Sequence, residues 1–84
     1  MKLDIKFTQL LKAIAEILID HPEKMEIKIL EGEKNIVIEV FCDGSDVGKL
    51  LGKGGSIAKA IRQIAVAAGY RARKSTKMYI IGNK

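Results

Sequence analysis

Two segments of the chain carry hydrophobic residues at helical spacing. The first starts at Thr8 and ends before Pro22, because the residue that precedes a proline leaves helical space. Its predicted apolar stripe consists of Leu10, Leu11, Ile14, Ile17 and Leu18. The second helix runs from a predicted N-cap at Ser56 to a predicted stop at Gly69. Its apolar positions are Ile57, Ala60, Ile61, Ile64, Ala65 and Ala68.

Three other segments show the period of two that is typical of strands. Residues 25–30 and 36–42 are separated by a turn that contains Gly32 and Asn35, which predicts an antiparallel hairpin. Residues 78–81 form a short last strand after a polar, basic connection. Because two helices precede it, this last strand can lie parallel beside residues 36–42 through a right-handed crossover.

A further short helix is predicted between the second strand and the glycine-rich loop. Ser45 or Asp46 can cap this helix, whose apolar positions are Val47, Leu50 and Leu51. The order of elements is therefore helix, strand, strand, helix, helix, strand. That order predicts an α+β fold in one domain over residues 1–84, with a three-stranded mixed sheet and the helices packed on one face.

The first seven residues allow two interpretations. Leu3, Ile5 and Phe7 alternate with polar residues as in a strand, whereas Asp4 can cap an early start of the first helix. Both interpretations stay open at the level of the sequence. These residues are therefore treated as an N-terminal extension of the domain.

Length and composition restrict the class of protein. Eighty-four residues suffice for one small domain, and a hydrophobic content of 48% is too high for a disordered chain. Charged residues interrupt the apolar runs well before about 18 residues, so we expect a soluble cytoplasmic protein without membrane association. One cysteine and one histidine, Cys42 and His21, cannot form an internal disulfide or a four-ligand zinc site. No metal or other cofactor is expected, and the strand pattern places Cys42 in the core.

Charge is divided unevenly along this basic chain, whose formal net charge is +5. Residues 1–46 hold ten acidic and six basic side chains, while residues 47–84 hold nine basic side chains and no acidic one. One interpretation is a solvated basic surface, because lysine stems commonly cover apolar area. The interpretation we favour is a surface for nucleic acid, since cations without acidic neighbours leave a positive field for a polyanion.

The sequence Leu-Gly-Lys-Gly-Gly-Ser at residues 51–56 carries the most specific chemical signal. Glycine permits positive φ and lets a phosphate approach the backbone amides. The helix that starts directly afterwards presents its unpaired N–H groups at the same place. Lys53 adds a mobile charge that suits phosphate contact rather than base recognition. The loop is therefore predicted to bind an anion.

Two nucleotide-binding motifs do not fit this loop. A P-loop needs four residues between its first glycine and Gly-Lys, but Gly48 and Gly52 are separated by three, and Gly54 stands where Ser or Thr is required. The dinucleotide fingerprint needs a third glycine where Ile57 stands. The chain also shows no paired catalytic groups, so we expect a protein that is not an enzyme.

A GxxG loop between two helices, preceded by a short Val-Gly-Lys-Leu-Leu helix, resembles a KH domain, and the helix-first order resembles its type II form. The Asp-His-Pro and Glu-Gly-Glu-Lys sequences, with residues 46–49 and 52–61, are similar to small bacterial single-KH proteins of the KhpA-like family. The resemblance covers nearly the whole chain and leaves residues 1–7 outside. It implies a non-catalytic protein that clamps the backbone of single-stranded RNA with the GxxG loop.

The resemblance also implies a groove for about four nucleotides, with the bases on an aliphatic floor. Val47, Leu50 and Ile61 either line this floor or pack against the sheet. Basic residues between positions 71 and 77 lie where type II domains carry a variable loop, which implies a second electrostatic contact. The residues implied in RNA contact are Lys49, Leu51, Gly52, Lys53, Gly54, Gly55, Ser56, Ile57, Lys59, Arg62, Arg71, Arg73 and Lys74.

The expected partners follow from the scarcity of aromatic residues and from the resemblance. Aromatic residues make up 5% of the chain, so few platforms can stack bases, and we expect low sequence specificity. The expected ligand is single-stranded RNA, with single-stranded DNA as an alternative. The resemblance implies a homodimer, or a heterodimer with another KH-domain protein. Val37, Phe41, Tyr79 and Ile81 alternate onto the sheet face away from the helices. The alternative function is therefore a protein-interaction or dimerisation module in which RNA binding is secondary.

Overall fold

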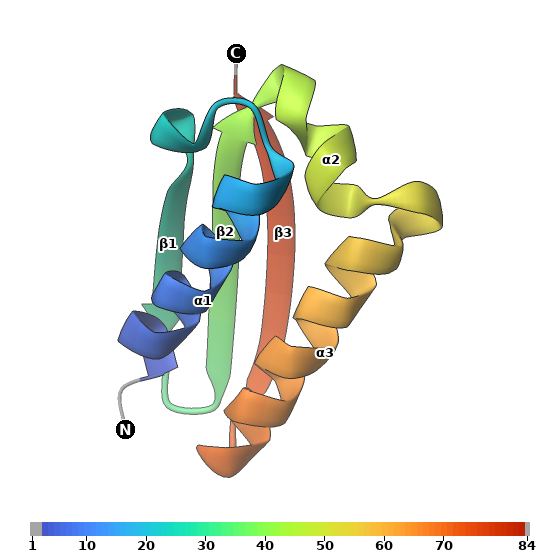
Figure 1. Cartoon of the computed structure of the whole chain (residues 1–84). Coiled ribbons are helices and arrows are strands. Elements are labelled where there is room, and N and C mark those ends of the chain that lie inside the picture. Colours follow the sequence, from blue (N-terminus) through green and yellow to red (C-terminus); the bar gives the residue numbers. More distant parts are fainter. Residues whose placement is uncertain (1–2, 84) are drawn as a thin grey trace.

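The computed structural model describes residues 3–83 as a layer of helices on a three-stranded sheet (Figure 1). The elements are α1 (Leu3–Leu18), a 3-10 turn (Pro22–Lys24), β1 (Glu26–Glu31), β2 (Asn35–Asp43), a second 3-10 turn (Gly44–Asp46), α2 (Val47–Leu51), a third 3-10 turn (Lys53–Gly55), α3 (Ser56–Arg71) and β3 (Ser75–Asn83). The predicted α+β fold is confirmed, because this order of helices and strands is that of the type II KH domain. Within residues 3–83, no helix has the length and apolarity that crossing a membrane requires.

The sheet is mixed and has the strand order β1-β2-β3. β1 pairs with β2 in antiparallel orientation, with Ile29 opposite Ile38, and β3 pairs with β2 in parallel, with Met78 opposite the same Ile38. Both predicted pairings are confirmed. The predicted last strand at residues 78–81 is too short, because pairing with β2 begins at Ser75 and includes polar residues that carry no apolar pattern.

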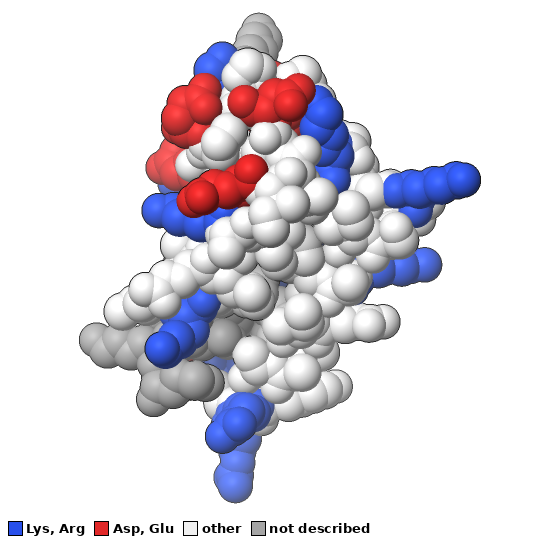
Figure 2. Space-filling model, viewed as in Figure 1, with Lys and Arg blue, Asp and Glu red and all other residues white. Residues whose placement is uncertain are grey.

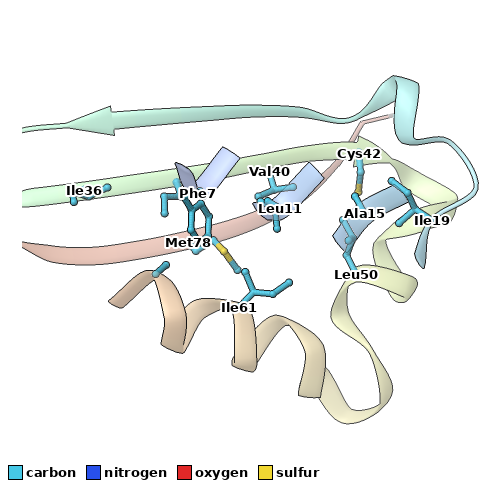
Figure 3. Packing of buried hydrophobic residues seen from close by; sticks show 12 residues of the cluster. Phe7, Leu11, Ala15, Ile19, Ile36, Val40, Cys42, Leu50, Ile61 and Met78 are labelled. Atoms are coloured by element: carbon cyan, nitrogen blue, oxygen red, sulfur yellow. The ribbon is translucent and has the colours of Figure 1, made fainter. Parts of the chain in front are cut away.

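The core lies between the sheet and the helices, which cover the same face of the sheet (Figure 1). β2 contributes alternate residues to it, namely Ile36, Ile38, Val40 and Cys42. Figure 3 shows Cys42 grouped with Ala15, Ile19 and Leu50 at the end of the core where α1 stops and α2 begins. Cys42 is buried as predicted, and desolvation above all raises the pKa of its thiol, which keeps the sulfur in its unreactive form.

The N-terminal segment is helical. α1 begins at Leu3, so the strand interpretation of the first residues is wrong from Leu3 onwards, while residues 1–2 lie outside the described part of the chain. Phe7, which the alternation had suggested as a strand residue, is buried in the core. Residues 3–7 therefore extend the helix, and Phe7 adds to the core.

The buried stripe of α1 is rotated relative to the prediction. It runs at intervals of four residues through Phe7, Leu11 and Ala15, and Ile19, directly after the helix, continues the same spacing. Leu10 is exposed and Ile17 is 82% exposed, although both were predicted to lie on the stripe. Since α1 carries aliphatic residues on more than one side, their spacing alone does not determine which side packs on the sheet.

α3 continues through Gly69 to Arg71, so the predicted stop at Gly69 is wrong. A Cβ atom on Gly69 would lie 2.1 Å from Thr76 Oγ1, which shows that this glycine lets α3 pack closely on β3. The helix closes with a 2.9 Å bond from the N–H of Lys74 to the carbonyl of Gly69, while Arg73 takes a left-handed φ of 58°. This is a Schellman closure in which arginine occupies the usual glycine position.

The side of α3 that packs on the sheet is narrower than predicted. Ile61 and Ala65 are buried as expected, whereas Ala60 and Ile64 are exposed. The basic connection to β3 is also shorter than predicted, because only residues 72–74 lie between the two elements. The region predicted to be a variable loop is thus a tight turn.

Candidate nucleic-acid interface

The loop between α2 and α3 contains three glycines with positive φ. These angles are 77° at Gly52, 63° at Gly54 and 78° at Gly55. Gly52 also has a ψ of 174°, a combination that is essentially restricted to glycine. A Cβ atom on Gly52 would lie 2.6 Å from Cγ1 of Ile57. The loop therefore turns tightly against the first turn of α3, as its glycine density predicts.

Backbone N–H groups at this loop are available to an anion. The N–H groups of Gly52 and Gly55 each make a 3.0 Å bond to a preceding carbonyl, but those of Lys53 and Gly54 have no acceptor within residues 3–83. Ser56 is the first residue of α3 rather than its predicted cap, and no side chain caps the helix. The open N-terminus of this 16-residue helix adds further donors and a positive dipole end.

Apolar side chains beside the loop fall into two groups. Leu51 is 37% exposed and Ile57 is partly buried, so both can contact a ligand held by the loop. Leu50 and Ile61 are buried in the core, and Val47 packs against it while staying partly accessible. For Leu50 and Ile61, packing between the helices and the sheet is therefore the correct interpretation.

A groove of about 460 Å³ follows the exposed side of α3 away from the loop. Its lining residues are Lys59, Arg62, Gln63, Val66, Ala67 and Tyr70. Arg62 Nη2 donates a 3.4 Å hydrogen bond to the carbonyl of Met78, which holds this guanidinium beside β3. Tyr70 lies at the other end of the groove and is 73% exposed. The groove therefore combines cations, which suit phosphates, with aliphatic surface and one aromatic ring, which suit the bases of a single-stranded nucleic acid.

Lys49 is paired with two carboxylates. Its Nζ lies 2.6 Å from Asp20 Oδ2 and 3.5 Å from Asp46 Oδ1. The hydrogen bond to Asp20 above all raises the pKa of the Lys49 ammonium, against partial desolvation. Asp46 also accepts the backbone N–H of Asp20 at 3.1 Å and that of His21 at 3.0 Å. We name Asp20, Asp46 and Lys49 the clasp, because they join the end of α1 to α2.

Asp46 is a residue whose importance the sequence did not reveal. It is completely buried, and this desolvation by itself raises the pKa of the carboxyl. The hydrogen bonds from the backbone of Asp20 and His21 and from Lys49 outweigh desolvation. They hold the pKa of the carboxyl below its usual range. Asp46 occupies the predicted N-cap position of α2, yet its side chain makes no capping bond to a backbone N–H of that helix. The capping bond found nearby is that of Asp43, which accepts the N–H of Ser45 at 3.1 Å. A carboxylate before a short helix was visible in the sequence, but its partner lies 25 to 26 residues away.

The predicted contacts Arg71, Arg73 and Lys74 lie at the other end of α3 from the loop. A helix of 16 residues is about 24 Å long, so these cations and the loop are separated by the full length of α3. Lys74 is also paired with Glu31 of β1. The structure therefore divides the predicted RNA contacts into a group around the loop and a separate basic group at the α3–β3 turn.

Acidic and basic side chains are unevenly distributed over the face of the molecule that Figure 2 shows. Figure 2 shows acidic side chains gathered at the top of the view, over the end of α1 and the following turn, whereas Lys and Arg project at the right, where Figure 1 places the loop and α3. Within residues 3–83, the cations of the second half that lack a carboxylate partner are Lys53, Lys59, Arg62, Arg71, Arg73 and Lys77. The field around the loop and along α3 is therefore positive.

Comparison with known proteins places this geometry in a family. The RNA-binding protein KhpA of Clostridium acetobutylicum is 40% identical over 73 residues, which are 87% of this chain and 97% of that protein. The RNA-binding protein KhpA of Aquifex aeolicus is 39% identical over 75 residues, which are 84% of this chain and 95% of that protein. No solved structure gives a significant match. The family described as "KhpA/KhpB, KH domain" matches residues 8–80, and the chain therefore belongs to this family.

Proposed function

We propose that this chain binds single-stranded RNA without catalysis and holds its sugar-phosphate backbone on the GxxG loop at residues 52–55. The observation that carries the proposal is the loop itself, with three glycines of positive φ and two N–H groups that have no acceptor in the described chain. The uncapped start of α3 adds positive charge at the same place, as does Lys53, which has no carboxylate partner within residues 3–83. The names of the KhpA relatives support RNA as the polyanion.

The RNA path that fits this geometry runs from the loop along α3. Leu51 and Ile57 offer apolar surface to the first bases, and the groove with Lys59 and Arg62 continues in the same direction. Most of these side chains are apolar or cationic and therefore suit bases of any kind or phosphate, so the binding depends mainly on phosphate contacts. Affinity is therefore expected to fall steeply as salt rises and to change little between base sequences.

The test is fluorescence-anisotropy binding of short single-stranded RNAs to the unaltered chain and to a Lys53→Asp, Gly54→Asp double variant. Both positions are exposed, and a Cβ atom on Gly54 would meet no atom within 4 Å, so the fold is expected to persist. A Gln9→Glu, Lys12→Glu double variant on α1 is the matched control, because it changes the net charge equally at exposed positions away from the loop. Circular dichroism confirms that each variant is folded.

The loop variant is expected to bind roughly tenfold or more weakly than the unaltered chain, while the α1 variant loses much less. Equal loss in both variants would show that only net charge matters and would contradict a clamp at the loop. DNA strands of the same sequence complete the test. Similar affinity for RNA and DNA agrees with backbone binding, whereas strong preference for RNA would indicate contacts to the 2′-hydroxyl group.

A second proposal, self-association, concerns the sheet face that no helix covers. The strand register places Leu30 beside Val37, and Phe41 beside Ile81, on this face. Leu30 is 59% exposed and Tyr79 is 49% exposed, so the face keeps accessible apolar surface. A contiguous patch of accessible apolar surface on a small protein commonly marks an interaction site.

The charges on this face favour a second copy of the chain as the partner. Glu26 lies in the row of Phe41 at one end of the face, and Lys77 lies in the row of Val37 at the other end, on the opposite edge strand. Glu26 and Lys77 therefore lie at diagonally opposite corners of the face. When two copies pack face to face about a two-fold axis that lies in the interface along the other diagonal, each Glu26 faces the Lys77 of the other copy. Such reciprocal contacts are the general property of a symmetric dimer interface.

The mass of the unaltered chain in solution at tens of micromolar tests this second proposal. A dimer is expected, and a Leu30→Lys, Tyr79→Lys variant is expected to be monomeric. Ile17→Lys is the control, because Ile17 is a highly exposed aliphatic residue on α1, away from the sheet face. A strictly monomeric mass for the unaltered chain would contradict self-association and leave the RNA proposal unaffected.

A further inference from the structure

We infer that the clasp of Asp20, Asp46 and Lys49 positions the GxxG loop for its ligand, so that Asp46 and Lys49 are positioning residues and not RNA contacts. The inference rests on the proposed RNA binding at the loop and adds the residues on which the shape of the loop depends. It also reassigns Lys49, which lies close to the loop in sequence and was expected to meet phosphate.

The first step concerns the stability of α2. This helix has five residues, far fewer than the roughly 12–15 that a helix needs to be even marginally stable alone. Its position must therefore come from tertiary contacts. The apolar contacts are Leu50, which is 1% exposed, and Val47, which packs against the core, and the polar contact is the buried Asp46 directly before the helix. Two anchors of different chemistry thus hold α2 against the rest of the domain.

The second step concerns the bonds that Asp46 makes. Both of its oxygens accept a backbone N–H from the segment that follows α1, one from Asp20 and one from His21. These two bonds point in fixed directions and so define where α2 starts. Because Asp46 makes no capping bond to α2, each of its two oxygens can accept a bond from the segment that follows α1.

The third step concerns Lys49. It lies on α2 three residues after Asp46 and closes the clasp through its contacts to Asp46 and Asp20. A charge that is already shared between two carboxylates has less net attraction for phosphate than the unpaired Lys53 or Lys59. Lys49 therefore neutralises the buried carboxylate and fixes the orientation of α2.

The last step connects the clasp to the loop. Only two residues, Leu50 and Leu51, separate Lys49 from Gly52. Gly52 donates its N–H to the carbonyl of Gly48 on α2 and packs against Ile57 on α3. A change in the position of α2 must therefore move the loop relative to the start of α3. The N–H groups of the loop and of the first turn of α3 point to one place only while the loop keeps its position relative to the start of α3.

The test compares Asp46→Asn with Asp43→Asn in RNA binding across a salt series. Both variants remove one negative charge, and Asp43 contacts Ser45 and Lys24 but neither α1 nor the loop. Charge alone predicts equal or slightly tighter binding for both variants. The clasp predicts that Asp46→Asn binds roughly threefold to tenfold more weakly than Asp43→Asn.

Lys49→Met and Lys59→Met separate positioning from phosphate contact. Loss of a lysine that contacts phosphate lowers the slope of log affinity against log salt by about one. Lys59→Met is expected to lower this slope, whereas Lys49→Met is expected to weaken binding with the slope unchanged. A lower slope in Lys49→Met, or equal affinities of Asp46→Asn and Asp43→Asn, would overturn the inference. Lys49 is partly exposed, so this variant also serves if Asp46→Asn does not fold.

Amide NMR spectra of the RNA-free protein give a readout that does not depend on binding. The N–H signals of Asp20, His21 and residues 52–55 are expected to shift in Asp46→Asn and Lys49→Met and to stay in place in Asp43→Asn. Unchanged loop signals in both clasp variants would refute positioning. Failure of the unaltered chain to bind RNA would instead overturn the proposed function, while these spectra would still show whether the clasp sets the loop.

Discussion

Gly52 and Ile57 are packed so closely that a Cβ atom on the glycine would lie 2.6 Å from Cγ1 of the isoleucine. This contact joins the end of α2 to the first turn of α3 across the loop. Gly52 also has φ 77° and ψ 174°, where other residues are strained. Both the contact and the backbone conformation therefore require glycine at this position.

Gly52→Ala is expected to lower the free energy of unfolding by about 3 kcal/mol, because backbone strain and steric overlap add together. Gly54→Ala is the matched control, since Gly54 has a positive φ of 63° but open space around its Cα. It is expected to cost only about 1 kcal/mol. Urea unfolding followed by circular dichroism measures both values. Similar losses in the two variants would show that the contact with Ile57 is not restrictive.

Gly69→Ala is expected to lower the free energy of unfolding by about 2 kcal/mol, because the added methyl group would overlap Thr76 and the carbonyl of Lys74. Gly48→Ala is the control within a helix. A Cβ atom there meets nothing within 4 Å, so the gain in helix propensity is expected to stabilise the protein by up to about 1 kcal/mol. Thermal unfolding distinguishes the two signs. Stabilisation by both substitutions would contradict the close packing of α3 on β3.

Arg73→Gly is expected to raise the free energy of unfolding by about 1 kcal/mol, because glycine suits the left-handed position in the Schellman closure of α3. The same variant tests Arg73 as an RNA contact at the end of α3 that is remote from the loop. If Arg73 meets phosphate, the salt slope falls by about one while stability rises. Arg71→Gln is the control for the loss of charge without the backbone effect. Unchanged stability in Arg73→Gly would contradict strain at this position.

Asp46 is expected to make stability depend on acid pH. The pKa of its carboxyl is held below the usual value, so its contribution is fully present above about pH 4, the value for an unfolded aspartate, and is lost as the pH falls through the lower folded value. The free energy of unfolding of Asp46→Asn should therefore fall less between pH 5 and pH 2 than that of the unaltered chain. Urea titrations at several pH values measure this difference. Parallel pH profiles would show that the carboxylate is not specifically stabilised in the folded state.

The fold was accessible from the sequence because its signals are local. The alternation in β2, the glycine-rich loop and the order of elements all depend on neighbouring residues, and the structure has each of them as predicted. The predictions that are wrong concern residues whose role depends on contacts with residues far away in the sequence. Gly69 was expected to end α3 as a local signal, but the proximity of Thr76 on β3 gives it a packing role inside the helix. Ile17 was expected in the core, but the side of α1 that faces the sheet leaves it in solvent.

The sequence by itself determined the type II KH order, the position of the GxxG loop and the excess of positive charge that surrounds it. Only the tertiary structure showed which cations are unpaired, because the pairing of Lys49 with Asp20 joins residues 29 positions apart. It also showed that Arg71 and Arg73 are far from the loop, since the 16-residue helix α3 lies between them. Periodicity and motif spacing depend only on residues that are close in the sequence, whereas charge pairing and burial depend on which residues are close in space.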